Sequence, residues 1–154
     1  MRVTTYRTKL NEDRLNILVK EKAVNYTTHS KLTSPSAIYD MMVDVFDMKN
    51  LAEEYLYLIA FDTKQSVLGV FEISHGTVNS SLISPREVFI KALLCGAVNV
   101  VLVHNHPSGD PSPSNADMQV TRRIKESGEL LGVKLLDHVI VGDSYYSMSE
   151  FGLI

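Results

Sequence analysis

Residues 100–117, VVLVHNHPSGDPSPSNAD, carry most of what this chain of 154 residues reveals about its fold. Residues 98–103, which include the start of this stretch, are almost all apolar and mostly β-branched, which is typical of a strand buried on both faces. A loop rich in Pro, Ser, Gly and Asp follows. Ser114, with Asp117 three positions later, then predicts the start of a helix over residues 115–130. A buried strand that leads into a helix indicates an α/β domain.

The segments around this stretch predict further helices and strands. Two more helices are expected, each with apolar residues at helical spacing after a Ser-Pro start signal, over residues 35–47 and 85–96. The second has the pattern of a capping box, with Ser84 at the cap, Pro85 at the first helical position and Glu87 at the third. Apolar runs between turn signals predict four further strands, over residues 54–61, 67–73, 133–141 and 145–148.

The first thirty residues are polar and weakly patterned, and only residues 15–20 there are consistent with an edge strand. The expected order of elements is therefore βαββαβαββ. This order implies a mixed sheet with helices packed on it.

Composition excludes several classes of protein. Apolar residues make up 45% and charged residues 21% of the chain, as in ordinary globular domains. The formal charge of −3 does not support DNA binding, and the one cysteine, Cys95, lies in an apolar run and cannot form an intrachain disulfide. We expect a cytoplasmic protein, because no apolar run could span a membrane and the N-terminal residues lack the apolar core of a signal peptide.

The chemistry is concentrated at the end of the predicted strand 98–103. His104 and His106 are two residues apart, so in an extended chain their imidazoles project from the same face. Two histidines and one carboxylate form a common catalytic zinc set, which leaves a fourth position open for water. The loop over residues 107–116 is long enough to bring Asp117 back to the strand end as the carboxylate.

Each of these residues also has a purely structural interpretation. A histidine at a strand end is often only a polar terminal residue. Asp117 would suit the first turn of a helix through the helix dipole alone, and Ser114 is adequate as a helix cap. The local pattern by itself leaves the metal site and these structural roles about equally open.

The order His104-x-His106, seven residues, Ser114, two residues, Asp117 resembles the JAMM motif, also called MPN+, of zinc metallopeptidases. The wider text HNHPSGDPSPS resembles the bacterial RadC-type branch of that family, and so do PREVF upstream and LDHVI downstream. The resemblance covers residues 34–154 and leaves residues 1–33 as an N-terminal extension. It implies a three-layer α/β/α sandwich around a mixed sheet, of the cytidine-deaminase-like kind. It also implies one zinc ion per chain.

The family's mechanism requires a glutamate on an early strand, for which Glu53, Glu54 and Glu72 are candidates. Alignment with the family implies Glu54, since Glu53 would face the other side of the strand and Glu72 lies on the next one. In the implied mechanism Glu54 moves a proton from water to the leaving amine, and Ser114 donates a hydrogen bond to the oxyanion. We expect Asn105 to point away from the imidazoles and hold the loop in place.

Three further expectations concern the remaining histidines and the basic residues. His138 is expected to pack or to support the zinc ligands from behind, whereas His29 and His75 are expected to be structural or surface residues. Arg122, Arg123 and Lys125 are expected to form a solvated helix face.

Three classes of function follow. The first is a zinc hydrolase that cleaves a peptide or isopeptide bond, the second a non-catalytic binding module, and the third a DNA-repair-associated accessory protein. RadC proteins carry an N-terminal helix-hairpin-helix region that could contact DNA, and about 33 residues are too few for that module. The tripeptide His-Asn-His is an accidental match to HNH nucleases, and nucleoside deamination needs a cysteine-rich zinc site.

Overall fold

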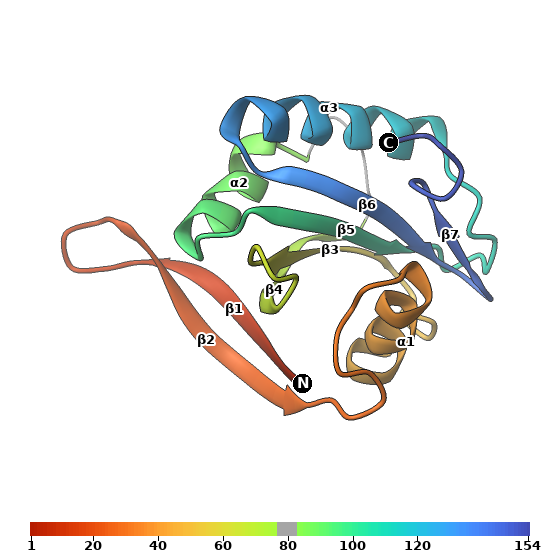
Figure 1. The fold of residues 1–154 in the computed structure, drawn as a ribbon, viewed down its shortest axis with the longest axis horizontal. Helices are drawn as coiled ribbons and strands as arrows, with labels where there is room; N and C mark the ends of the chain where they lie inside the picture. Colours follow the sequence, from red (N-terminus) through yellow and green to blue (C-terminus); the bar gives the residue numbers. More distant parts are fainter. Residues whose placement is uncertain (77–82) are drawn as a thin grey trace.

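Seven strands form one mixed sheet in the order β2-β1-β4-β3-β5-β6-β7 in the computed structural model, which describes residues 1–76 and 83–154 (Figure 1). The strands are β1 (Arg2–Leu10), β2 (Asn16–Asn25), β3 (Glu54–Phe61), β4 (Val67–Gly76), β5 (Asn99–Asn105), β6 (Lys134–Val141) and β7 (Tyr145–Ser147). The helices are α1 (Pro35–Phe46), α2 (Pro85–Leu94) and α3 (Asn115–Leu131). The β5–β6 and β1–β4 pairs are parallel and the others antiparallel. The expected α/β class with a mixed sheet is confirmed.

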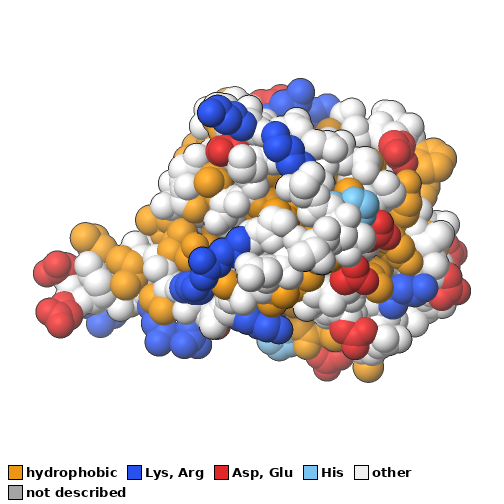
Figure 2. Space-filling view, turned by 60° about the horizontal axis from the view of Figure 1, so that its bottom comes forward, with side chains coloured by type: hydrophobic (Ala, Val, Ile, Leu, Met, Phe, Trp, Pro, Cys, Tyr) orange, Lys and Arg blue, Asp and Glu red, His pale blue; other side chains and the backbone are white. Residues whose placement is uncertain are grey.

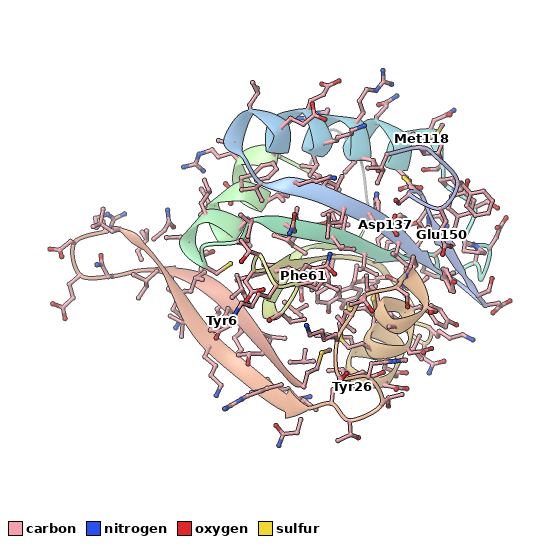
Figure 3. All side chains as sticks on the ribbon, viewed as in Figure 1. Tyr6, Tyr26, Phe61, Met118, Asp137 and Glu150 are labelled. Atoms are coloured by element: carbon pink, nitrogen blue, oxygen red, sulfur yellow. The ribbon has the colours of Figure 1, made fainter. Side chains whose placement is uncertain are left out.

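Helices pack on both faces of this sheet because the central strands are apolar on both sides. On one face Phe61 of β3 packs with Ile38 and Met41 of α1 (Figure 3). On the other face Leu58 and Leu102 pack with buried residues of α2 and α3. Alternate residues of β3 and β5 therefore belong to different cores, and this alternation decides which polar residues at the strand ends can meet.

The N-terminal strand β1 corrects the expected order, which becomes ββαββαβαββ. The edge strand predicted over residues 15–20 overlaps β2, which begins at Asn16 and lies at the edge of the sheet, but β1 was not expected. Of the residues of β1 only Val3 is buried, so this strand has almost no alternation of apolar and polar residues. It is held instead by backbone pairing with β2 on one side and with β4 on the other, in a hairpin that projects from the body (Figure 1).

The helix starts agree with the predicted positions, with one correction at α2. The Ser34 hydroxyl accepts a hydrogen bond from the backbone N–H of Ala37 at 3.2 Å and caps α1. In contrast, the Ser84 side chain makes no capping hydrogen bond among the described residues, so the predicted capping box does not form. The Glu87 carboxylate accepts a hydrogen bond from its neighbour Arg86 at 2.8 Å.

Charged side chains occur in separate groups of both signs on the face drawn in Figure 2. Within the described part of the chain, no helix combines the length and the apolar character needed to cross a membrane.

Candidate metal centre

The end of β5 and the first turn of α3 bring His104, His106 and Asp117 together. The Nε2 atoms of the two histidines are 2.9 Å apart. Asp117 places Oδ1 3.2 Å from His104 Nε2 and Oδ2 3.5 Å from His106 Nε2. Ligands of a tetrahedral zinc ion with bonds of about 2.1 Å lie roughly 3.4 Å from one another, so this set fits such an ion. His104 and Asp117 are buried, whereas His106 is partly exposed.

A capping box holds the Asp117 carboxylate in this position. The Ser114 hydroxyl accepts from the backbone N–H of Asp117 at 3.2 Å, and Asp117 Oδ2 accepts from the backbone N–H of Ser114 at 2.7 Å. The Ser114 hydroxyl also donates to Asp117 Oδ2 at 2.6 Å. One short motif thus both starts α3 and orients a carboxylate toward the two histidines.

The loop between the ligands is attached to the turn that follows β6. His106 donates its backbone N–H to the carbonyl of Val141 at 2.8 Å, and Asp143 donates its backbone N–H to the carbonyl of Gly109 at 2.7 Å. The ring atom His106 Nδ1 lies 2.8 Å from the backbone carbonyl of Asp110. Because a carbonyl can only accept, Nδ1 carries the proton in the neutral ring and Nε2 has its lone pair toward Asp117.

The charges at this cluster stabilise one another. Burial alone would raise the pKa of Asp117, but hydrogen bonds from His104 and His106 hold it well below its usual range. The hydrogen bond to Asp117 raises the pKa of His106, against the opposing effect of burial, and the charge of Glu54 acts in the same direction. The centre is therefore suited to hold a positive charge.

Strand register places Glu54 beside the site. Leu56 of β3 pairs with His104 of β5 in an antiparallel ladder. Glu54 begins β3 two residues before Leu56, so by alternation its side chain is on the same face as Leu56 and His104. The charge of Glu54 acts on His106. Glu53 belongs to the opposite face. Glu72 forms an exposed ion pair with His75 at 2.8 Å. The structure thus brings Glu54 to the cluster, and its role as the proton carrier stays a prediction.

Asn105 contacts a different segment from the one expected. It does point away from the imidazoles, but it bonds to the start of β3 and not to the loop. Its Oδ1 accepts from the backbone N–H of Tyr55 at 2.7 Å, and its Nδ2 donates to the backbone carbonyl of Glu53 at 3.0 Å. Its position between two ligand histidines, on a strand buried on both faces, was the signal available in the sequence.

Support behind His104 comes from His138, as expected, and from Thr121, which sequence reasoning missed. His138 Nε2 lies 2.8 Å from His104 Nδ1, and Thr121 Oγ1 lies 2.6 Å from His138 Nδ1. Complete burial lowers the pKa of His138 well below its usual value and so favours the neutral ring. A polar residue one helical turn after Asp117 was the signal for Thr121.

The fold and these contacts define a mixed α/β domain with a two-histidine, one-aspartate site that could hold a metal ion. Residues 32–153 match the RadC-like JAB domain, and the chain belongs to that family. It is 42% identical over 123 residues to a UPF0758 protein of Alkaliphilus metalliredigens, covering 79% of this chain and 52% of that protein. It is also 42% identical over 134 residues to a UPF0758 protein of Clostridium perfringens, covering 86% and 58%. The chain spans about half the length of the curated relatives it matches.

Proposed function

We propose that this chain is a zinc-dependent hydrolase of the JAMM type that cleaves a peptide or isopeptide amide bond. The observation that carries the proposal is the cluster of His104, His106 and Asp117 with Glu54 on the same face of the sheet. Membership of the RadC-like JAB family supports it. We further propose that the fold is the three-layer α/β/α sandwich of the cytidine-deaminase-like class. Cores between the sheet and α1, and between the sheet and α2 with α3, support that assignment.

Two imidazole nitrogens and a carboxylate oxygen are the donor set of many catalytic zinc sites. A zinc ion bound there lowers the pKa of its water toward 7 and polarises a carbonyl group. The partial exposure of His106 leaves one side of the cluster open to solvent and to a substrate, while His104 and Asp117 are buried.

The chain's own residues supply the proton transfer. Glu54 would accept a proton from the attacking water and deliver it to the nitrogen of the leaving amine. Ser114 would donate a hydrogen bond to the carbonyl oxygen as it becomes negative. To do so its hydroxyl must rotate, because its single proton is donated to Asp117 Oδ2 in this structure.

The test begins with the metal content of purified protein. We expect about one zinc per chain in the wild type and loss of zinc in His104→Ala and Asp117→Ala. His75→Ala is the matched control, since His75 is exposed and its partners among the described residues, Glu72 and Tyr55, are not members of the cluster. Zinc retained by both ligand variants would contradict the site.

The second stage tests hydrolysis with libraries of peptide and isopeptide substrates. Cleavage by the zinc-loaded wild type, and its loss in the zinc-free ligand variants, is the expected result. A zinc-loaded wild type that cleaves no member of either library would contradict amide hydrolysis and favour a binding module.

A further inference from the structure

A buried chain of hydrogen bonds runs from His104 away from the cluster and returns to Asp117. His104 Nδ1 contacts His138 Nε2 at 2.8 Å, and His138 Nδ1 contacts Thr121 Oγ1 at 2.6 Å. Thr121 Oγ1 also lies 2.6 Å from the backbone carbonyl oxygen of Asp117. The side chains of His104, His138 and Thr121 are all buried, so water cannot replace any of these partners.

The direction of the chain follows from the number of protons available. A threonine hydroxyl has one proton, and the carbonyl of Asp117 can only accept. Thr121 therefore donates to this carbonyl and must accept the proton on His138 Nδ1. The neutral His138 then has only a lone pair at Nε2, so it accepts from His104 Nδ1. In a neutral His104 ring this leaves Nε2 without a proton, whereas an imidazolium keeps the same Nδ1–H toward His138 and also donates from Nε2 to Asp117, 3.2 Å away.

We propose that Thr121 and His138 are positioning residues that fix the tautomer of His104, with its proton on Nδ1 and its Nε2 lone pair directed at the metal position. The inference rests on the proposed zinc site. If the chain ran in the opposite direction, His104 would carry its proton on Nε2, the atom that must bind the metal.

Thr121 decides the direction of the hydrogen bonds behind His104. The two ligand histidines differ here, because His106 contacts a carbonyl and His104 contacts an imidazole. His106 donates to the Asp110 carbonyl, which can never donate in return. His104 is supported by an imidazole, which can donate or accept at Nε2 according to its own tautomer. The Thr121 hydroxyl removes this ambiguity because its one proton goes to an acceptor, the Asp117 carbonyl at 2.6 Å with Met148 Sδ as the more distant alternative at 3.2 Å. The contact with the carbonyl also links two of the three ligands.

The test compares Thr121→Val with Thr121→Ser. Valine keeps the branched shape but offers no acceptor, so a proton on His138 Nδ1 would be buried without a partner and the reversed tautomers become favoured. We expect zinc affinity, measured by competition with a chromophoric chelator, to fall about 10- to 100-fold in Thr121→Val. Thr121→Ser keeps the hydroxyl and should stay close to the wild-type affinity.

A second measurement needs no variant and no metal. Nitrogen-15 NMR of the histidine rings in the zinc-free wild type should show His104 protonated at Nδ1, and Thr121→Val should move the proton toward Nε2. A wild-type His104 protonated at Nε2 but not at Nδ1, or wild-type zinc affinity in a folded Thr121→Val, would overturn the inference. Zinc binding without hydrolysis would contradict the proposed function but leave both readouts intact. Absence of zinc binding would contradict that function while the NMR measurement still decides the tautomer.

Discussion

Asn105 accepts a hydrogen bond at 2.7 Å from the backbone N–H of Tyr55, a residue fifty positions earlier in the chain. Its amide nitrogen donates to the backbone carbonyl of Glu53 at 3.0 Å. The two bonds attach the backbone on both sides of Glu54 to the strand that carries His104 and His106. A single carboxamide, 1% exposed, therefore connects the candidate base to the candidate metal ligands.

Replacement of Asn105 by alanine should destabilise the protein by about 2 kcal/mol or more, because the backbone groups of Glu53 and Tyr55 each lose a partner. Urea denaturation measures this loss. Asn50→Ala is the matched control, since the Asn50 amide makes an exposed bond to Asp47. Equal stability of the Asn105 and Asn50 variants would show that the two bonds contribute nothing.

Glu54→Gln should keep the zinc content of the wild type and lose hydrolysis by roughly 10²- to 10⁴-fold, because glutamine cannot accept the proton. Glu53→Gln makes the same chemical change at the exposed residue just before β3 and should leave the rate unchanged. Steady-state rates on a substrate from the libraries decide between them. Full activity of Glu54→Gln would make the assignment of the base wrong.

Gly142→Ala should weaken the metal site from outside it. A Cβ atom at this position would lie 2.3 Å from the carbonyl oxygen of Gly109, so the loop that carries Asp110 must shift. We expect a loss of stability of about 1–3 kcal/mol together with weaker zinc binding.

Gly96→Ala separates these two effects in chelator competition and urea denaturation. Gly96 has a positive φ of 71° but no neighbour within 4 Å of the added Cβ. Its alanine variant should lose stability and keep zinc affinity. Unchanged zinc affinity in Gly142→Ala would contradict the proposed influence of the loop.

In the metal-free protein, the Asp117–His106 pair should contribute most to stability between about pH 4 and 6.5. The folded pKa of Asp117 lies below its unfolded value, so its contribution is present above about pH 4 and is lost as the pH falls. The folded pKa of His106 lies above its unfolded value, so its contribution is present below about pH 6.5 and is lost as the pH rises.

Urea midpoints of the metal-free protein from pH 3 to 9 test this profile. Asp117→Asn removes the carboxylate whose own pKa is lowered and whose hydrogen bond raises the pKa of His106. The stability of the variant should therefore depend less on pH on both sides of the maximum. A variant profile that runs parallel to that of the wild type would refute the contribution of the pair.

Much of the fold was predictable because its elements carry local signals. Residues 98–103 are apolar enough to specify a buried strand, and the starts of α1 and α3 follow from Ser34 and Ser114. Strand β1 could not be predicted, because an exposed hairpin needs no apolar alternation. The prediction of a capping box at Ser84 was wrong: its side chain makes no capping hydrogen bond among the described residues, and Glu87 pairs with Arg86.

The sequence by itself determined that His104 and His106 share one strand face, because side chains two apart on a strand always do. It also placed Ser114 and Asp117 in one helical turn, where a capping box orients the carboxylate. The family resemblance selected Glu54 from three glutamates.

Only the tertiary structure decided which other residues lie beside the cluster of His104, His106 and Asp117. The register of β3 against β5 pairs Leu56 with His104 and so puts Glu54, two residues before Leu56, on the face of that histidine. The packing of α3 on β6 brings Thr121 to His138. Asn105 finds its partners across the same β3–β5 pair. Such contacts join residues far apart in the chain. They depend on strand register and helix packing, which leave no periodic signal in the local sequence.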